Sequence, residues 1–141
     1  MAGKKLRIIL DTNVLYAGLY SSRGASFKVL RAIADGKMRG VLSTALLFEY
    51  EDVLKRNQEI LNLSNRAIEK VLGNLCFLSD HQKIYFLWRP RLSDPKDDHL
   101  LELAVAAGVK FVVTHNTSDF KGSDKFGVRA ITPKELLEEI V

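Results

Sequence analysis

Residues 6–13 read LRIILDTN, a short apolar run that ends at Asp11 and is followed by Thr12 and Asn13. The apolar run by itself fits either a strand or a piece of a helix. The β-branched pair Ile8 and Ile9, and the polar residues that stop the run, favour a buried first strand followed by a turn or a helix cap. We therefore expect this strand to bring the Asp11 carboxylate to the rim of a sheet.

The composition is that of one globular domain, which we expect to cover residues 1–141. Hydrophobic residues make up 47% and charged residues 27% of the chain, which argues against disorder. The single cysteine, Cys76, can form neither an internal disulfide nor a zinc cluster, so a packing role is expected. No stretch has the length of a signal peptide or a membrane span, so we expect a cytoplasmic setting without membrane association.

The net charge is +4, which makes a polyanionic partner plausible. The basic residues are scattered along the chain, however, and many small proteins are mildly basic for no specific reason. Charge alone favours nucleic acid only slightly.

Strand and helix patterns alternate along the rest of the chain. Residues 57–63 fit a connection or a short helix, and residues 79–92 fit an extended segment that a proline interrupts. Alternation of this kind indicates a parallel sheet covered by helices on both faces, in one α/β domain. The other expected helices cover residues 14–19, 25–34, 44–56, 64–78, 95–107 and 133–140, and the later strands cover 40–43, 110–114 and 127–131.

Acidic and polar residues recur at corresponding ends of these elements. Asp11 follows the first strand, and Asn116 follows the strand at residues 110–114, with Asp119 three residues on. Glu49 is on a helix after the second strand, and Asp97 is in the first turn of a helix. In parallel sheets, ligands collect beyond the carboxyl ends of the strands. Carboxylates that converge there repel one another unless a cation neutralises them, and oxygen-rich sites select magnesium or manganese. Such an ion suits phosphodiester hydrolysis.

Each of these residues also has an ordinary structural interpretation. Asp11 and Asp97 fit helix caps, because a carboxylate in the first turn complements the helix dipole. Glu49 by itself fits a solvated helix residue, and Asn116 and Asp119 fit turn formers. The functional interpretation therefore depends on the combination.

Periodicity leaves two choices open. Glu49 and Glu51 lie on opposite shoulders of the apolar stripe of their helix, so either can point into a cleft. Asp98 competes with its neighbour Asp97 in the same way. The three histidines show no metal-ligand spacing, and no role is predicted for His81, His99 or His115.

Several motifs together resemble the PIN-domain family. They are the opening strand with Asp11-Thr12-Asn13, LLFEYEDVL around Glu49, DPKDDHLLELAVAAG around Asp97, VVTHNTSDF, and the closing GVRAITPKELLEEI. The closest likeness is to the toxin components of bacterial and archaeal toxin–antitoxin pairs (VapC-like). The resemblance implies a three-layer, flavodoxin-like α/β/α sandwich with a mainly parallel sheet. It also implies a Mg²⁺- or Mn²⁺-dependent ribonuclease that acts on single-stranded or structured RNA.

The resemblance also implies site residues by position. Asp11, Glu49 and Asp97 match the metal-binding acids of the family. Asn13 and Thr114 match polar residues that support them.

The fourth acidic position of the family is occupied here by Asn116, and Asp119 is the residue one turn further on that would replace the charge. Arg23 or Lys121 would contact the RNA backbone. The family further implies a homodimer and a cognate antitoxin protein that covers the cleft.

Two other functions remain open. A PIN-like module that binds RNA or protein without chemistry would explain Asn116 as a sign of decay. Phosphoryl transfer through a phosphorylated Asp11 is a distant third, because such sites want a second acid two residues on, where this chain has Asn13.

Overall fold

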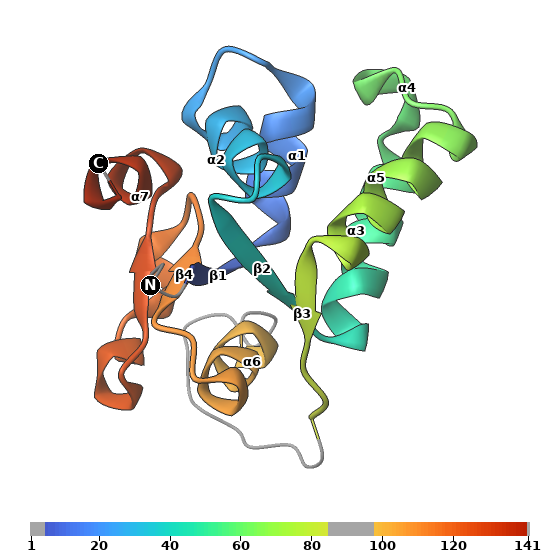
Figure 1. The fold of residues 1–141 in the computed structure, drawn as a ribbon. Helices are drawn as coiled ribbons and strands as arrows, with labels where there is room; N and C mark the ends of the chain where they lie inside the picture. The colour runs from blue at the N-terminus through green and yellow to red at the C-terminus, as the bar shows by residue number, and fades with distance from the viewer. Residues whose placement is uncertain (1–4, 85–97, 141) are drawn as a thin grey trace.

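The computed structural model describes residues 5–84 and 98–140, in which five strands form one sheet. All neighbouring strands are parallel, in the order β3-β2-β1-β4-β5. This confirms the predicted α/β fold with a parallel central sheet (Figure 1). The strands are β1 (Leu6–Leu10), β2 (Met38–Leu42), β3 (Ser79–His81), β4 (Phe111–Val113) and β5 (Arg129–Ile131).

Strand β1 is the central strand, and its sequence shows why. Ile8 and Ile9 are 0% exposed and Leu10 is 3% exposed, so consecutive residues on both faces of the strand are buried. A strand covered on both faces carries a continuous apolar run rather than an alternating pattern.

Helices lie on both sides of this sheet. Figure 1 shows α1, α2 and α7 on one side and α6 on the other, with α3, α4 and α5 grouped beyond the β3 edge. None of the helices within residues 5–84 and 98–140 is long and apolar enough to cross a membrane. Their bounds are α1 (Thr12–Tyr20), α2 (Ala25–Ala34), α3 (Thr44–Arg56), α4 (Gln58–Leu61), α5 (Asn65–Phe77), α6 (Asp98–Ala107) and α7 (Pro133–Glu139).

The predicted helix starts are largely confirmed. The Ser43 hydroxyl caps α3, the Ser64 hydroxyl caps α5, and Thr132 and Glu135 form the complete capping box of α7. The predicted start of α6 near residue 95 lies outside the described residues, as does Asp97.

Several predicted boundaries differ from the structure by one or two residues, and two differences have a clear cause. Strand β2 begins at Met38, two residues before the predicted start, because it pairs with β1 from Leu6 onward and Met38 is buried. Residues 115–120, predicted as a polar loop, include the short 3-10 helix η2 (Thr117–Phe120), because Phe120 is buried in the core.

The strand order places a ligand crevice at one point of the sheet. The chain moves from β1 to β2 and β3 on one side, and then returns to β4 and β5 on the other side of β1. In open parallel sheets, the crevice at such a reversal, beyond the carboxyl ends of the two strands, is the usual binding site. The residues that follow β1 and β4 are Asp11 and Thr114.

Candidate functional site

Asp11 and Thr114 lie side by side because of the strand register. Leu10 pairs with Val113, and the Asp11 backbone N–H donates to the Val113 carbonyl at 2.9 Å. The Thr114 hydroxyl donates to Asp11 Oδ2 at 2.8 Å. Asp11 stands at the N-cap position of α1, where its side chain makes no cap hydrogen bond.

Asn13 connects the same pair to the loop after β4. Its amide nitrogen lies 3.4 Å from both Asp11 Oδ2 and Thr114 Oγ1, and its side-chain oxygen accepts from the His115 N–H at 3.3 Å. The Asn116 backbone N–H donates to the Thr114 hydroxyl oxygen at 3.1 Å. Asn116 thus reaches this cluster through its backbone.

Glu49 joins the cluster from α3, and Glu51 does not. The Glu49 carboxylate accepts a hydrogen bond from the Thr12 hydroxyl and lies 3.3 Å from His99 Nε2. Glu51 forms a salt bridge with Lys55 instead, at 3.5 Å. The structure thus resolves the choice that periodicity left open.

Tyr50 fixes α3 against β1. Its side chain is 1% exposed, and its hydroxyl donates to the Leu10 carbonyl at 2.7 Å, one residue before Asp11. Burial, together with the negative charges of Asp11 and Glu49, raises the pKa of Tyr50 well above its ordinary value, so the hydroxyl stays protonated and keeps donating. Helical periodicity places Tyr50 only on the apolar stripe of α3, because periodicity carries no signal for a buried hydroxyl.

The surroundings of the Asp11 carboxyl oppose its ionisation. Its exposure is 9%, and burial raises its pKa above the ordinary value of 3.8. The hydrogen bond from Thr114 and those from the backbone N–H groups of Asn13 and Thr12 lower the pKa of Asp11. The negative charge of Glu49 raises it, and the net shift is upward. Two carboxylates that oppose each other's ionisation in this way form a site that favours a cation.

The raised pKa of Asp11 predicts a pH-dependent stability difference in metal-free protein. Well below pH 3.8 the carboxyl is protonated in both folded and unfolded chains, and no penalty exists. The penalty grows as the pH rises through 3.8 toward the folded-state pKa and is complete above it. Asp11→Asn removes the penalty, so we expect its free energy of unfolding, relative to wild type, to rise over this range. Urea titrations in EDTA at a series of pH values measure this, and a pH-independent difference would contradict it.

The described residues do not form a complete metal site. Within residues 5–84 and 98–140, no group of three His, Cys, Asp or Glu side chains is arranged to hold a metal ion. The third predicted acid, Asp97, lies outside these residues. Asp119 lies in η2, where its N–H donates to the Asn116 carbonyl at 3.0 Å. Two carboxylates with neighbouring hydroxyl and amide oxygens still fit Mg²⁺ or Mn²⁺, because such ions bind through one or two carboxylates and take water and phosphate oxygens as well.

Two histidines without a predicted role lie at or beside the cluster. His99 approaches Glu49 from α6, and His115 Nε2 lies 2.9 Å from the Ser26 hydroxyl. Neither contact has a sequence signal, because the partners are 50 and 89 residues apart.

Comparisons with known proteins bear on the family and the fold of this chain. The family model described as PIN domain matches residues 7–118. One similar solved structure is that of VapBC2 from Rickettsia felis bound to a DNA fragment from the VapBC2 promoter. Its TM-score is 0.53, at 17% sequence identity. The match covers 90% of this chain and 98% of that one, and at this identity it concerns the fold. No curated protein sequence matches the chain.

Proposed function

This chain belongs to the PIN-domain family, and we propose that it is a divalent-metal-dependent endoribonuclease, the toxin of a toxin–antitoxin pair. The observation that carries the proposal is the convergence of Asp11 and Glu49, from distant parts of the sequence, on the crevice beyond β1 and β4. A buried carboxylate opposed by a second one is typical of a cation site.

The residues that would hold Mg²⁺ or Mn²⁺ are Asp11 and Glu49, with Asp97 as a third ligand. Asn116 and Asp119 would complete the set, directly or through water. When bound, the ion supplies electrostatic stabilisation of the phosphate and a more acidic water for the attack.

The chain's own side chains prepare the site for that chemistry. Thr114 fixes the rotamer of Asp11 by its hydrogen bond, and Asn13 ties both to the loop after β4. Thr12 and His99 hold the Glu49 carboxylate from two sides, so that it is placed either to bind the ion or to orient the attacking water. Support of this kind around a ligand sets both its geometry and its basicity.

The proposed substrate is RNA, and the proposed partner is an antitoxin. The net charge of +4 favours a polyanion, and Arg23 and Lys121 are the basic residues proposed to contact phosphates. The structural relative is a VapBC2 complex with promoter DNA, which supports an antitoxin partner for this chain. We also propose a homodimer.

Manganese-dependent cleavage of a mixed RNA pool tests the activity. We expect cleavage with Mn²⁺ or Mg²⁺ and none in EDTA, because the ion would supply the acidic water and the stabilisation of the phosphate. Mn²⁺ should also raise the thermal midpoint, since a ligand at about one hundred times its Kd stabilises a fold by about 2.7 kcal/mol. Cleavage that persists in EDTA would refute the proposed role of the metal.

A binding module without chemistry is the second candidate, and Asn116 at the fourth acidic position favours it. Calorimetry with Mn²⁺ separates the two candidates. A ribonuclease of the proposed kind takes up the ion at this crevice, whereas RNA binding without Mn²⁺ uptake or cleavage would favour the module.

A further inference from the structure

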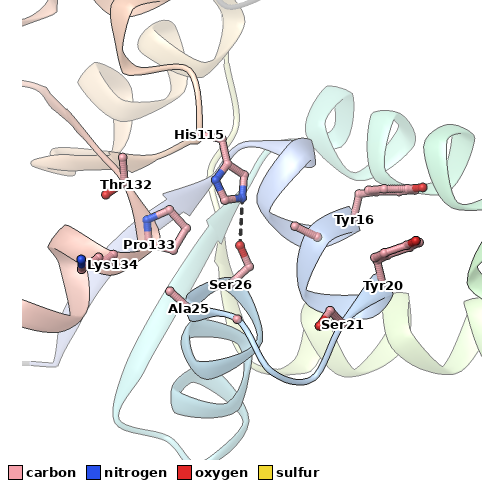
Figure 2. A pocket seen from close by; sticks show the side chains of 11 residues that line it. Tyr16, Tyr20, Ser21, Ala25, Ser26, His115, Thr132, Pro133 and Lys134 are labelled. Carbon is pink, nitrogen blue, oxygen red and sulfur yellow. Dashed lines mark hydrogen bonds between the residues drawn. The ribbon is translucent and has the colours of Figure 1, made fainter.

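A cavity of about 360 Å³ lies next to the proposed catalytic site. We name it the tyrosine pocket. Figure 2 shows its two sides: Tyr16 and Tyr20 on one, Pro133 and Lys134 on the other, with His115 above Ser26 between them. Its lining comes from α1, the start of α2, the start of α7 and the loop after β4.

The pocket is joined directly to the catalytic cluster. His115 lines the pocket, and the preceding residue, Thr114, donates its hydroxyl proton to Asp11. The His115 backbone N–H also donates to Asn13 at 3.3 Å. The His115 side of the pocket is therefore the side next to Asp11.

The two tyrosine rings of the pocket are stacked on each other, and one of them is exposed to solvent. The rings of Tyr16 and Tyr20 stack with their centroids 6.0 Å apart and their planes at 18°. Tyr20 is nevertheless 62% exposed, although a tyrosine that served the core would be buried. An exposed ring backed by a second ring is a platform on which a planar base stacks.

The lining of the tyrosine pocket is mainly apolar, and its polar groups include Ser26, His115 and Lys134. The Ser26 hydroxyl, on a residue that is 4% exposed, lies 2.9 Å from His115 Nε2 and so orients the imidazole from below (Figure 2). Lys134 contributes a positive charge. The residues that line the cavity, all of them within the described ranges, include no carboxylate.

We propose that the tyrosine pocket binds one unpaired base of the RNA substrate, adjacent to the phosphate that is cleaved. The proposal rests on the proposed function and adds to it a subsite for the base next to the cut. The base stacks on the Tyr20 ring, the His115 imidazole presents its edge to the base, and Lys134 contacts the RNA backbone. An apolar protein segment would also fit the cavity, but the link to Asp11, the positive charge of Lys134 and the lack of lining carboxylates favour a nucleotide.

Binding of a short fluorescent single-stranded RNA in EDTA tests the pocket separately from cleavage. Tyr20→Ala should weaken binding on the order of tenfold, the usual effect of losing one stacked base, and Tyr20→Phe should bind like wild type. An RNA with an abasic nucleotide at the position that enters the pocket should bind wild-type protein about as weakly as intact RNA binds Tyr20→Ala. With this abasic RNA, Tyr20→Ala should cause no further loss of affinity. Lys134→Gln should instead reduce the slope of log affinity against log salt by about 0.7, as expected for one single-strand phosphate contact.

The outcomes distinguish this inference from the proposed function. If Tyr20→Ala loses RNA affinity and Tyr20→Phe keeps it, the result supports base binding in the pocket, even if no cleavage is found with Mn²⁺. Equal affinity of wild type and Tyr20→Ala for every RNA overturns it, even if the protein cleaves RNA. A change of oligomeric mass in Tyr20→Ala with unchanged RNA affinity also overturns it and assigns the pocket to a protein interface.

Discussion

Asp11→Asn should reduce Mn²⁺-dependent RNA cleavage on the order of a thousandfold, because the metal's contribution is worth several kcal/mol and about 1.4 kcal/mol corresponds to a factor of ten. The asparagine retains an oxygen that accepts the Thr114 hydrogen bond but loses the charge that would hold the ion. Initial rates of cleavage on a defined RNA, with wild type and variant side by side, measure the effect.

The same substitution should leave the fold intact. Its side chain has the size of the original, and it removes a buried charge whose ionisation both burial and Glu49 oppose. Circular dichroism and the urea midpoint in EDTA provide the control. A variant that is folded and cleaves RNA as fast as wild type would show that Asp11 does not hold a catalytic metal.

The sequence predicted the fold well because its signals were local and consistent. The continuous apolar run of β1 and the helix starts at residues 44 and 133 each depend on neighbouring residues, and each is found in the structure. Local signals that agree with one another are what specify a fold. Boundaries were less predictable where tertiary contacts decide, as at Met38 and Phe120.

The candidate site was predictable as a set of positions but not as a network. Strand ends indicated that Asp11 and the residues after β4 would share one rim, and the register places Thr114 against Asp11. The contacts of His99 with Glu49 and of Tyr50 with the Leu10 carbonyl arise only when α3, α6 and β1 are packed together. No spacing in the sequence encodes them.

Glu49 and Glu51 offer a matched pair of substitutions on one helix. Glu49→Gln should lower the cleavage rate on the order of 10- to 100-fold, because it removes a charge from the proposed metal site while keeping the side chain's size. Glu51→Gln breaks only the pair with Lys55 at 3.5 Å and should leave cleavage unchanged. Loss of that ion pair should lower the free energy of unfolding by about 0.3–0.5 kcal/mol. Rates at saturating Mn²⁺, with thermal midpoints for both variants, give the comparison.

Metal titration of the pair then separates two roles for Glu49. If Glu49 binds the ion, Glu49→Gln should need more Mn²⁺ for half-maximal cleavage, and excess Mn²⁺ should recover part of the rate. If it orients the attacking water, the Mn²⁺ requirement should stay and only the maximal rate should fall. Equal effects of Glu49→Gln and Glu51→Gln would contradict both roles, because the two carboxylates share a helix and differ in whether they face the crevice. The contrast therefore tests whether charge at this crevice, rather than charge on α3 in general, is what cleavage requires.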